Sequence, residues 1–103
     1  MSASSQIIYW RDIPAQVQVR NAAERFSVPL SLRFQKAIDS AAVRSGLTGT
    51  DAYLDQWRTS PWQPIDGEPQ STAAALVAEL EDSYNAEHLK SLIHNNGYRA
   101  FLV

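Results

Sequence analysis

The sequence predicts an α+β domain: a small antiparallel or mixed sheet with about four helices packed on one face. Residues 6–20 alternate with a period of two and are rich in β-branched and aromatic side chains, which is typical of a β-hairpin. Four later segments between residues 31 and 96 carry apolar residues at helical spacing. Residues 98–103 alternate again, so we expect the sheet to combine the N-terminal hairpin with a C-terminal strand.

The N-terminal hairpin is expected to turn near Pro14, because proline cannot donate a hydrogen bond within a strand ladder. Its first strand is apolar on both faces, so we expect a neighbour on each of its edges. In the second strand, Val17 and Val19 point to one side and Gln16 and Gln18 to the other, which indicates that one face of this strand is exposed to solvent. The C-terminal strand is expected to lie beside the first strand.

Residues 31–45 have the spacing of an amphipathic helix. Ser31 can cap its start, and Ser27 with Pro29 in the first turn is the alternative. Gly46 fits the left-handed conformation that follows a last helical turn. The expected buried stripe consists of Phe34, Ile38, Ala41 and Ala42.

A short second helix is expected over residues 51–58, with Thr50 as its cap and Tyr53, Leu54 and Trp57 on one face. Residues 59–70 contain three prolines and an Asp-Gly pair, and they form the least regular part of the sequence. We expect Trp62 and Ile65 to anchor this stretch as a loop or as a short edge strand.

The last two predicted helices follow one another closely. Ser71 or Thr72 can open the third helix, and Asn85 can cap a fourth helix over residues 86–96 that ends at Gly97. The expected buried residues are Leu76, Val77, Leu80 and Tyr84 in the third helix and Leu89, Leu92 and Ile93 in the fourth.

Length and composition indicate one domain. The 103 residues are close to the commonest domain size, and we expect a flexible N-terminus over residues 1–5 and a single domain over residues 6–103. The chain has no cysteine, which excludes disulfides and thiolate chemistry. The N-terminus lacks the apolar run of a signal peptide, and no stretch approaches the roughly 20 apolar residues of a membrane span. We therefore expect a cytoplasmic protein that does not enter a membrane.

The net charge of −2 argues against a nucleic-acid-binding protein. The charge is uneven, because residues 1–46 carry +3 and residues 47–103 carry −5. One interpretation is that the two halves interleave and the difference partly cancels. The other is a basic patch that faces an acidic partner or a second copy of the chain.

The residues used most often in catalysis do not form a recognisable set. His88 and His94 are six residues apart on one predicted helix, roughly 240° around its axis, so they cannot share a metal ion. The acidic pairs have no histidine at metal-ligand spacing, and the glycines form no phosphate or dinucleotide loop. We expect no enzyme activity, no metal and no cofactor; an active site without a known motif is the remaining alternative.

Tryptophan and arginine stand next to each other in two short runs of the sequence. The candidate binding residues come from these runs, and they are Trp10, Arg11, Asp12, Trp57 and Arg58. One interpretation is that each indole packs in the core with its N–H bonded. The other is a binding surface, since tryptophan and arginine dominate interface hot spots.

The leading hypothesis is a non-enzymatic module that uses these residues to bind a protein partner, a homodimer included. The alternative is a small-molecule-binding or enzyme-accessory domain whose arginines hold an anionic ligand. On the leading hypothesis, alanine at Arg11 and Arg58 weakens partner capture and leaves the melting temperature nearly unchanged. Loss of folding would instead make these side chains structural.

Two parts of the sequence resemble a known family. The first is IYWRDIPAQV over residues 8–17, and the second is FQKAID over residues 34–39 continuing to GTDAYLDQWR over residues 49–58. Together they resemble a small bacterial family labelled "virulence factor" domain, which also occurs fused to HEAT-repeat proteins called conserved virulence factor C. The resemblance covers most of residues 6–100. It implies a bacterial protein and no particular reaction or catalytic residue.

Overall fold

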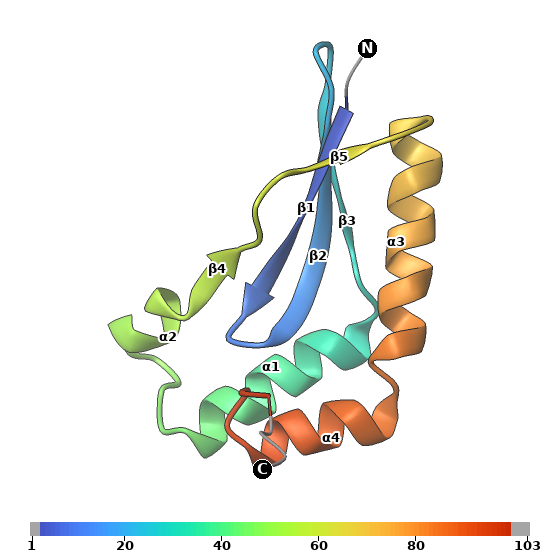
Figure 1. The fold of residues 1–103 in the computed structure, drawn as a ribbon. Coiled ribbons are helices and arrows are strands. Elements are labelled where there is room, and N and C mark those ends of the chain that lie inside the picture. Colours follow the sequence, from blue (N-terminus) through green and yellow to red (C-terminus); the bar gives the residue numbers. More distant parts are fainter. Residues whose placement is uncertain (1–2, 100–103) are drawn as a thin grey trace.

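The computed structural model describes residues 3–99, and within them the chain forms an antiparallel sheet of five strands with four helices (Figure 1). This confirms the predicted α+β class. The elements are β1 (Ala3–Trp10), β2 (Ile13–Arg20), β3 (Arg25–Pro29), α1 (Leu32–Arg44), α2 (Asp51–Asp55), β4 (Trp57–Thr59), β5 (Gln63–Ile65), α3 (Pro69–Ser83) and α4 (Ala86–His94).

β1 lies inside the sheet, as its two apolar faces predicted. It pairs with β2 along one edge, and along the other edge it pairs with β4 at its C-terminal end and with β5 at its N-terminal end. β4 and β5 therefore occupy the edge that was expected for the C-terminal strand. Residues 98–99 are not in a strand, and residues 100–103 lie outside the described part of the chain.

The third strand, β3, was not predicted. It pairs antiparallel with β2, from Gln16 opposite Pro29 to Arg20 opposite Arg25. Phe26 and Val28 alternate with exposed neighbours and pack toward the core, so a period-two signal was present. Five residues with a proline at the end form a weak local pattern, and pairing with β2 is what makes them a strand.

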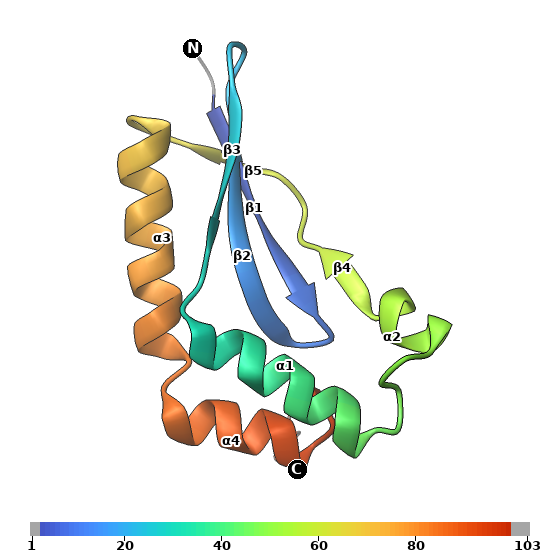
Figure 2. The same cartoon turned by 180° about the vertical axis from the view of Figure 1, so that it is seen from behind.

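Two clusters of apolar side chains hold the helices against the sheet. One lies between α3 and the sheet face, where Val17 and Val19 are fully buried. The other centres on Trp10, Phe34 and Ile38. α3 runs along the sheet, whereas α1 and α4 lie side by side across the end that carries the β1–β2 turn (Figures 1 and 2).

The predicted buried faces and caps are largely confirmed. Thr50 caps α2 by accepting a hydrogen bond from the Tyr53 N–H, and Asn85 caps α4 by accepting one from the His88 N–H. The residues that the structure buries as expected are Phe34, Ile38, Ala41 and Ala42 in α1 and Leu89 and Leu92 in α4. Two expectations differ. The side chains predicted to be buried in α3, and Ile93 in α4, are half-buried against the core clusters, with Ala73 the buried residue of α3. Leu54 is 64% exposed.

Several boundaries differ from those predicted. β1 begins at Ala3, and Ala3 and Ser5 of the expected N-terminal tail are buried because they pair with β5. The second helix ends at Asp55, since the next residues pair with β1 as β4. The third helix begins at Pro69, where the missing N–H of proline costs no helical hydrogen bond.

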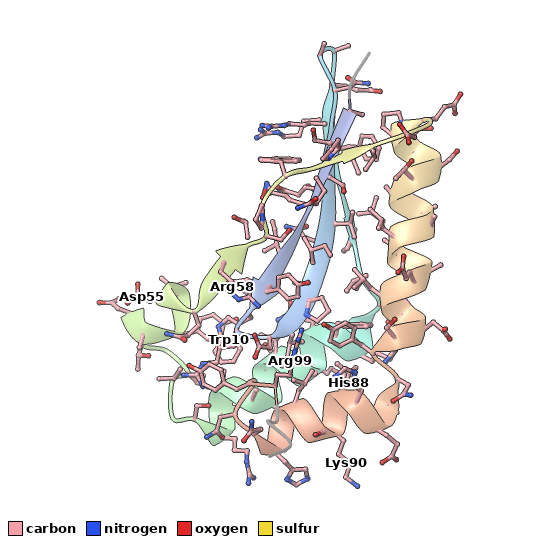
Figure 3. All side chains as sticks on the ribbon, viewed as in Figure 1. Trp10, Asp55, Arg58, His88, Lys90 and Arg99 are labelled. Atoms are coloured by element: carbon pink, nitrogen blue, oxygen red, sulfur yellow. The ribbon has the colours of Figure 1, made fainter. Side chains whose placement is uncertain are left out.

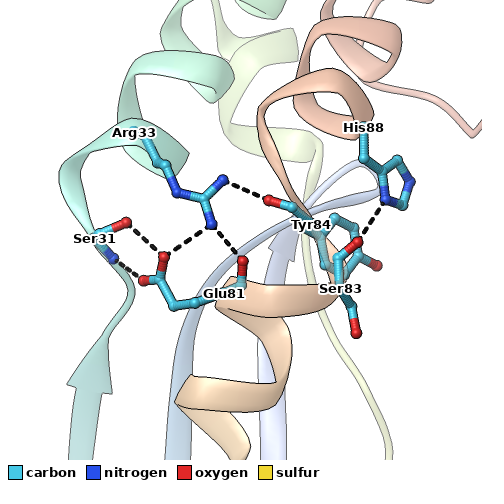
Figure 4. A network of polar contacts seen from close by, with 6 residues as sticks. All are labelled: Ser31, Arg33, Glu81, Ser83, Tyr84 and His88. Atoms are coloured by element: carbon cyan, nitrogen blue, oxygen red, sulfur yellow. Dashed lines mark hydrogen bonds and ion pairs between the residues drawn. The ribbon is translucent and has the colours of Figure 1, made fainter.

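A polar network joins the start of α1 to the end of α3 (Figure 4). Ser31 is the N-cap residue of α1, but its side chain does not cap the helix. The Glu81 carboxylate instead accepts hydrogen bonds from the Ser31 N–H at 2.6 Å and hydroxyl at 2.8 Å, and Arg33 donates to it at 3.0 Å. Burial raises the pKa of Glu81, but the hydrogen bonds from Ser31 and the charge of Arg33 outweigh it and hold this pKa below its ordinary value of 4.5.

Replacing Glu81 with glutamine is expected to lower the free energy of unfolding at pH 7 by about 1 kcal/mol, since the carboxylate is partly exposed and serves as a helix cap. Its pKa is lower in the folded than in the unfolded state. The contribution is therefore present above roughly pH 4.5 and is lost as the pH falls through the folded-state pKa.

Denaturant unfolding of the wild type and Glu81→Gln at pH 7 and pH 3 measures this effect. The difference between the two proteins should shrink at pH 3, while Glu79→Gln, an exposed carboxylate on the same helix, should match the wild type at both values. An equal difference at both pH values would show that the charge of Glu81 does not stabilise the fold.

Candidate functional site

The turn between β1 and β2 is held by segments far away in the sequence. Arg11 in this turn has a φ of 54°, which is uncommon for a residue other than glycine. Its N–H donates to the Gln56 carbonyl at 3.0 Å, and the N–H of Asp12 donates to the Gly97 carbonyl at 2.9 Å. These two bonds fix the turn between the segment after α2 and the segment after α4.

The Arg11 side chain connects the turn to the same two segments that its backbone contacts. It donates to the Asn96 carbonyl at 2.7 Å, to the Ser45 hydroxyl at 3.1 Å and to the Gln56 side-chain oxygen at 3.1 Å. It also lies 4.5 Å from the centre of the Tyr98 ring. One side chain therefore ties the β1–β2 turn to the ends of α1, α2 and α4.

Trp10 supports this end of the molecule from the inside. It is fully buried, its indole N–H donates to the Tyr53 carbonyl at 2.9 Å, and its ring centre lies 5.5 Å from that of Tyr53. Gly97 lies against the indole with a φ of 91°, and a Cβ there would stand 3.0 Å from the ring, so the indole would have to shift to make room for it. Of the two interpretations of the tryptophans, core packing is the one that applies to Trp10.

Arg58 forms the outer layer of the same region. Its guanidinium makes an ion pair with Asp12 at 3.0 Å, donates to the Arg11 carbonyl at 2.8 Å and lies 4.4 Å from the centre of the Tyr9 ring. The second carboxylate oxygen of Asp12 accepts a hydrogen bond from the Arg99 N–H at 2.7 Å. About half of the Arg58 side chain is exposed.

The structure thus brings all five candidate binding residues to one end of the sheet, where Figure 3 shows Trp10, Arg58 and Arg99 around the turn. Trp10 and Arg11 form the inside of this region. We call its outer surface the Arg58 corner, defined by Asp12, Arg58 and Tyr98. Trp57 precedes Arg58 in β4, so its side chain lies on the other face of the strand, where it is half-buried against the core cluster. Tyr98, which is 46% exposed, was placed in a strand by the sequence and was missed as a candidate.

The histidines lie apart from this region on α4. The His88 ring stacks on Tyr84 with centres 4.6 Å apart, and its Nδ1 lies 3.1 Å from the Ser83 carbonyl. His94 is exposed at the end of the helix. Within residues 3–99, no three histidine or carboxylate side chains are grouped so that they could bind a metal ion.

Two tyrosines of this region have a shifted pKa. Burial and the charge of Asp39 raise the pKa of Tyr53, and the second is Tyr9, which lies under Arg58. Burial raises its pKa, and the nearby Tyr84 adds to the increase, while Arg58 and Arg99 act in the opposite direction. The Tyr9 phenol therefore stays protonated at neutral pH. It can donate a hydrogen bond at the Arg58 corner but is not poised to act as a base.

The fold and the Arg58 corner define a small α+β domain whose arginine and aromatic residues gather at one end of an antiparallel sheet. A family model described as virulence factor matches residues 8–93, and the chain belongs to that family. The resemblance seen in two parts of the sequence is confirmed by this match. No curated protein and no solved structure matches the chain. None of the helices within residues 3–99 is long and apolar enough to cross a membrane.

The contacts of Arg11 and Arg58 predict different results for the two alanine variants. Arg11→Ala removes three hydrogen bonds of a charged group at a part-buried site and should lower the free energy of unfolding by about 2–4 kcal/mol. Arg58→Ala removes an exposed ion pair and should cost about 1 kcal/mol or less.

Thermal unfolding tests this difference, and a drop of roughly 10 °C or more is expected for Arg11→Ala alone. The sequence led us to expect an unchanged melting temperature for both variants, and the structure limits that expectation to Arg58. Similar melting temperatures for both would mean that the Arg11 hydrogen bonds contribute little.

Proposed function

We propose that this domain is a non-enzymatic module that binds a protein partner through the Arg58 corner. The observation that supports this most directly is the contrast between the two arginines at this end of the sheet. Arg11 is engaged inside the fold, whereas Arg58 and Tyr98 stand partly exposed above it. Arginine and tyrosine are enriched among the residues that dominate binding energy at protein interfaces.

The corner is also held in place before a partner arrives. Asp12 orients Arg58, and the Arg11 carbonyl and the Tyr9 ring restrict it further. On the other face of β4, Trp57 packs edge-on against Tyr53 at 6.3 Å between ring centres, which fixes the strand that carries Arg58. Side chains that are already ordered lose less conformational entropy on binding, so more of the contact energy remains as affinity.

The surface pockets within residues 3–99 favour a binding function over catalysis. Three of them have volumes of about 210, 240 and 450 Å³, at or below the lower part of the range of about 300–1,000 Å³ for ligand pockets. Their linings contain one carboxylate, Asp39, and no histidine. Tyr53 lines the pocket of about 210 Å³ together with Asp39, but burial and the charge of Asp39 raise the pKa of Tyr53, so this phenol stays protonated at neutral pH and is not available as a base.

The alternative of an anionic ligand held by arginines has less support. Arg11 and Arg33 already donate to carbonyl and carboxylate groups of the chain itself. A ligand would have to displace these partners. Cytoplasmic location is part of the same proposal, because the chain has no cysteine and secreted domains of this size often use disulfides.

Charge reversal at the corner tests the proposal. The domain carrying Arg58→Glu should lose its partner in affinity capture from the bacterium that encodes it, because glutamate next to Asp12 repels the groups that arginine would bind. Arg25→Glu, an exposed arginine on β3, is the matched control and should capture the same protein as the wild type.

Sedimentation of the purified wild type decides whether that partner is a second copy. A dimer lost in Arg58→Glu and kept in Arg25→Glu would identify the corner as a homodimer interface. Equal capture by the wild type and Arg58→Glu, with both variants folded, would contradict the proposal.

A further inference from the structure

A second surface lies where α1 meets α4, at the outer edge of the core cluster that contains Ala37 and Leu89. α1 and α4 lie side by side, and a hollow of about 240 Å³ runs between them. Ala37, Leu89 and Ile93 line it with apolar groups, and Lys36 and Lys90 stand at its rim. We call this hollow the α1–α4 groove.

The α1–α4 groove is positively charged although the chain as a whole has a net charge of −2. Its lining contains Arg33, Lys36 and Lys90 and no carboxylate. Arg33 is occupied, because it donates to Glu81 and to the Tyr84 carbonyl. Lys36 and Lys90 are exposed, and within residues 3–99 their ammonium groups form no ion pair. Two cations therefore remain for an external group.

The exposed face of α1 extends the groove in both directions. Leu32, Lys36, Ser40 and Val43 follow one another at spacings of four, four and three, so they share one face of the helix. Leu32 is 65% and Val43 67% exposed, which makes them two of the most exposed large apolar residues described. The distance along α1 from Leu32 to Val43 is about 16 Å, or three helical turns.

We propose that the α1–α4 groove binds an acidic amphipathic helix of a partner protein. Apolar side chains of that helix would cover Ile93 and the exposed Leu32 and Val43, over a floor formed by the buried Ala37 and Leu89. Its carboxylates would pair with Lys36 and Lys90. A helix is the favoured shape because two packed helices present a groove into which the side-chain ridge of a third can fit. This interaction is separate from the Arg58 corner, with which the groove shares no residue.

The charges also give the bound helix a direction. Beyond Ser40 the groove opens into a second hollow, which is lined by Asp39, Val43 and Arg44. The Asp39 carboxylate, which accepts a hydrogen bond from Gln35 at 2.9 Å, offsets the charge of Arg44 there, so this end attracts acidic side chains less than the end with Lys36 and Lys90. The carboxylates of the partner should therefore gather near Lys36 and Lys90, with its apolar residues toward Val43.

A defined peptide tests this proposal. The probe is a synthetic 14-residue amphipathic helix with leucine on one face and glutamate on its flanks, and the matched peptide carries lysine in place of every glutamate. In NMR titrations with the labelled domain, the acidic peptide should shift the amide signals of Ala37, Ser40 and Ile93. The basic peptide should leave these signals unchanged.

Charge reversal in the groove provides the second test. The double variant Lys36→Glu/Lys90→Glu should bind the acidic peptide at least about tenfold more weakly than the wild type. Arg25→Glu/Arg58→Glu changes the net charge by the same amount outside the groove and should bind like the wild type. This control also separates the two proposals, since it removes the Arg58 corner and leaves the α1–α4 groove intact.

Three results would overturn the proposal. The first is no shift at the groove residues with the acidic peptide, and the second is equal binding by Lys36→Glu/Lys90→Glu. The third is a dimer of the wild type that the groove variant loses, because the occupant would then be a second copy of the chain. Both exchanged lysines are exposed, so unfolding is not expected, and thermal unfolding of each variant verifies this.

Discussion

The arrangement of this domain depends on one arginine in a two-residue turn. The Arg11 guanidinium and backbone reach Ser45, Gln56 and Asn96, which are 34, 45 and 85 residues away along the chain. No other residue of the turn could span these three segments, because the contacts require a long side chain with several hydrogen-bond donors in one planar group. The buried indole of Trp10 beneath it and the absent Cβ of Gly97 allow the segments to come this close.

A second arginine does the same at the opposite end of α1. Arg33 and Ser31 bind Glu81, so the start of α1 is joined to the end of α3, as the Arg11 network joins the end of α1 to the β1–β2 turn. With both ends anchored, α1 is held across the end of the sheet and α4 packs beside it. Both proposed surfaces follow from this placement. The α1–α4 groove lies along one edge of α1, and the Arg58 corner lies at the edge of the β1–β2 turn that α1 covers.

Much of the fold could be predicted because the signals for it are local. The alternation in residues 6–20 identified two strands, and Thr50 and Asn85 identified two helix starts. The turn expected near Pro14 was placed wrongly: it lies at residues 11–12, and Pro14 is inside β2, opposite Tyr9. β3, β4 and β5 have three to five residues each, too few for a clear period, and they are strands because β1 or β2 supplies their hydrogen bonds. The candidate site was predicted by residue type alone, and the sequence could not separate the inner Arg11 from the outer Arg58.

By itself, the sequence determined the α+β class, the central position of the first strand and the apolar stripes of the helices, because these depend on side-chain periods that repeat within a few residues. Only the tertiary structure decided which arginines are engaged and which are exposed. That distinction depends on Gln56, Asn96 and Glu81, each of which meets its arginine across at least 45 positions of the chain. Contacts at such separations leave no periodic trace in the sequence, and they exist only once the helices have packed against the sheet.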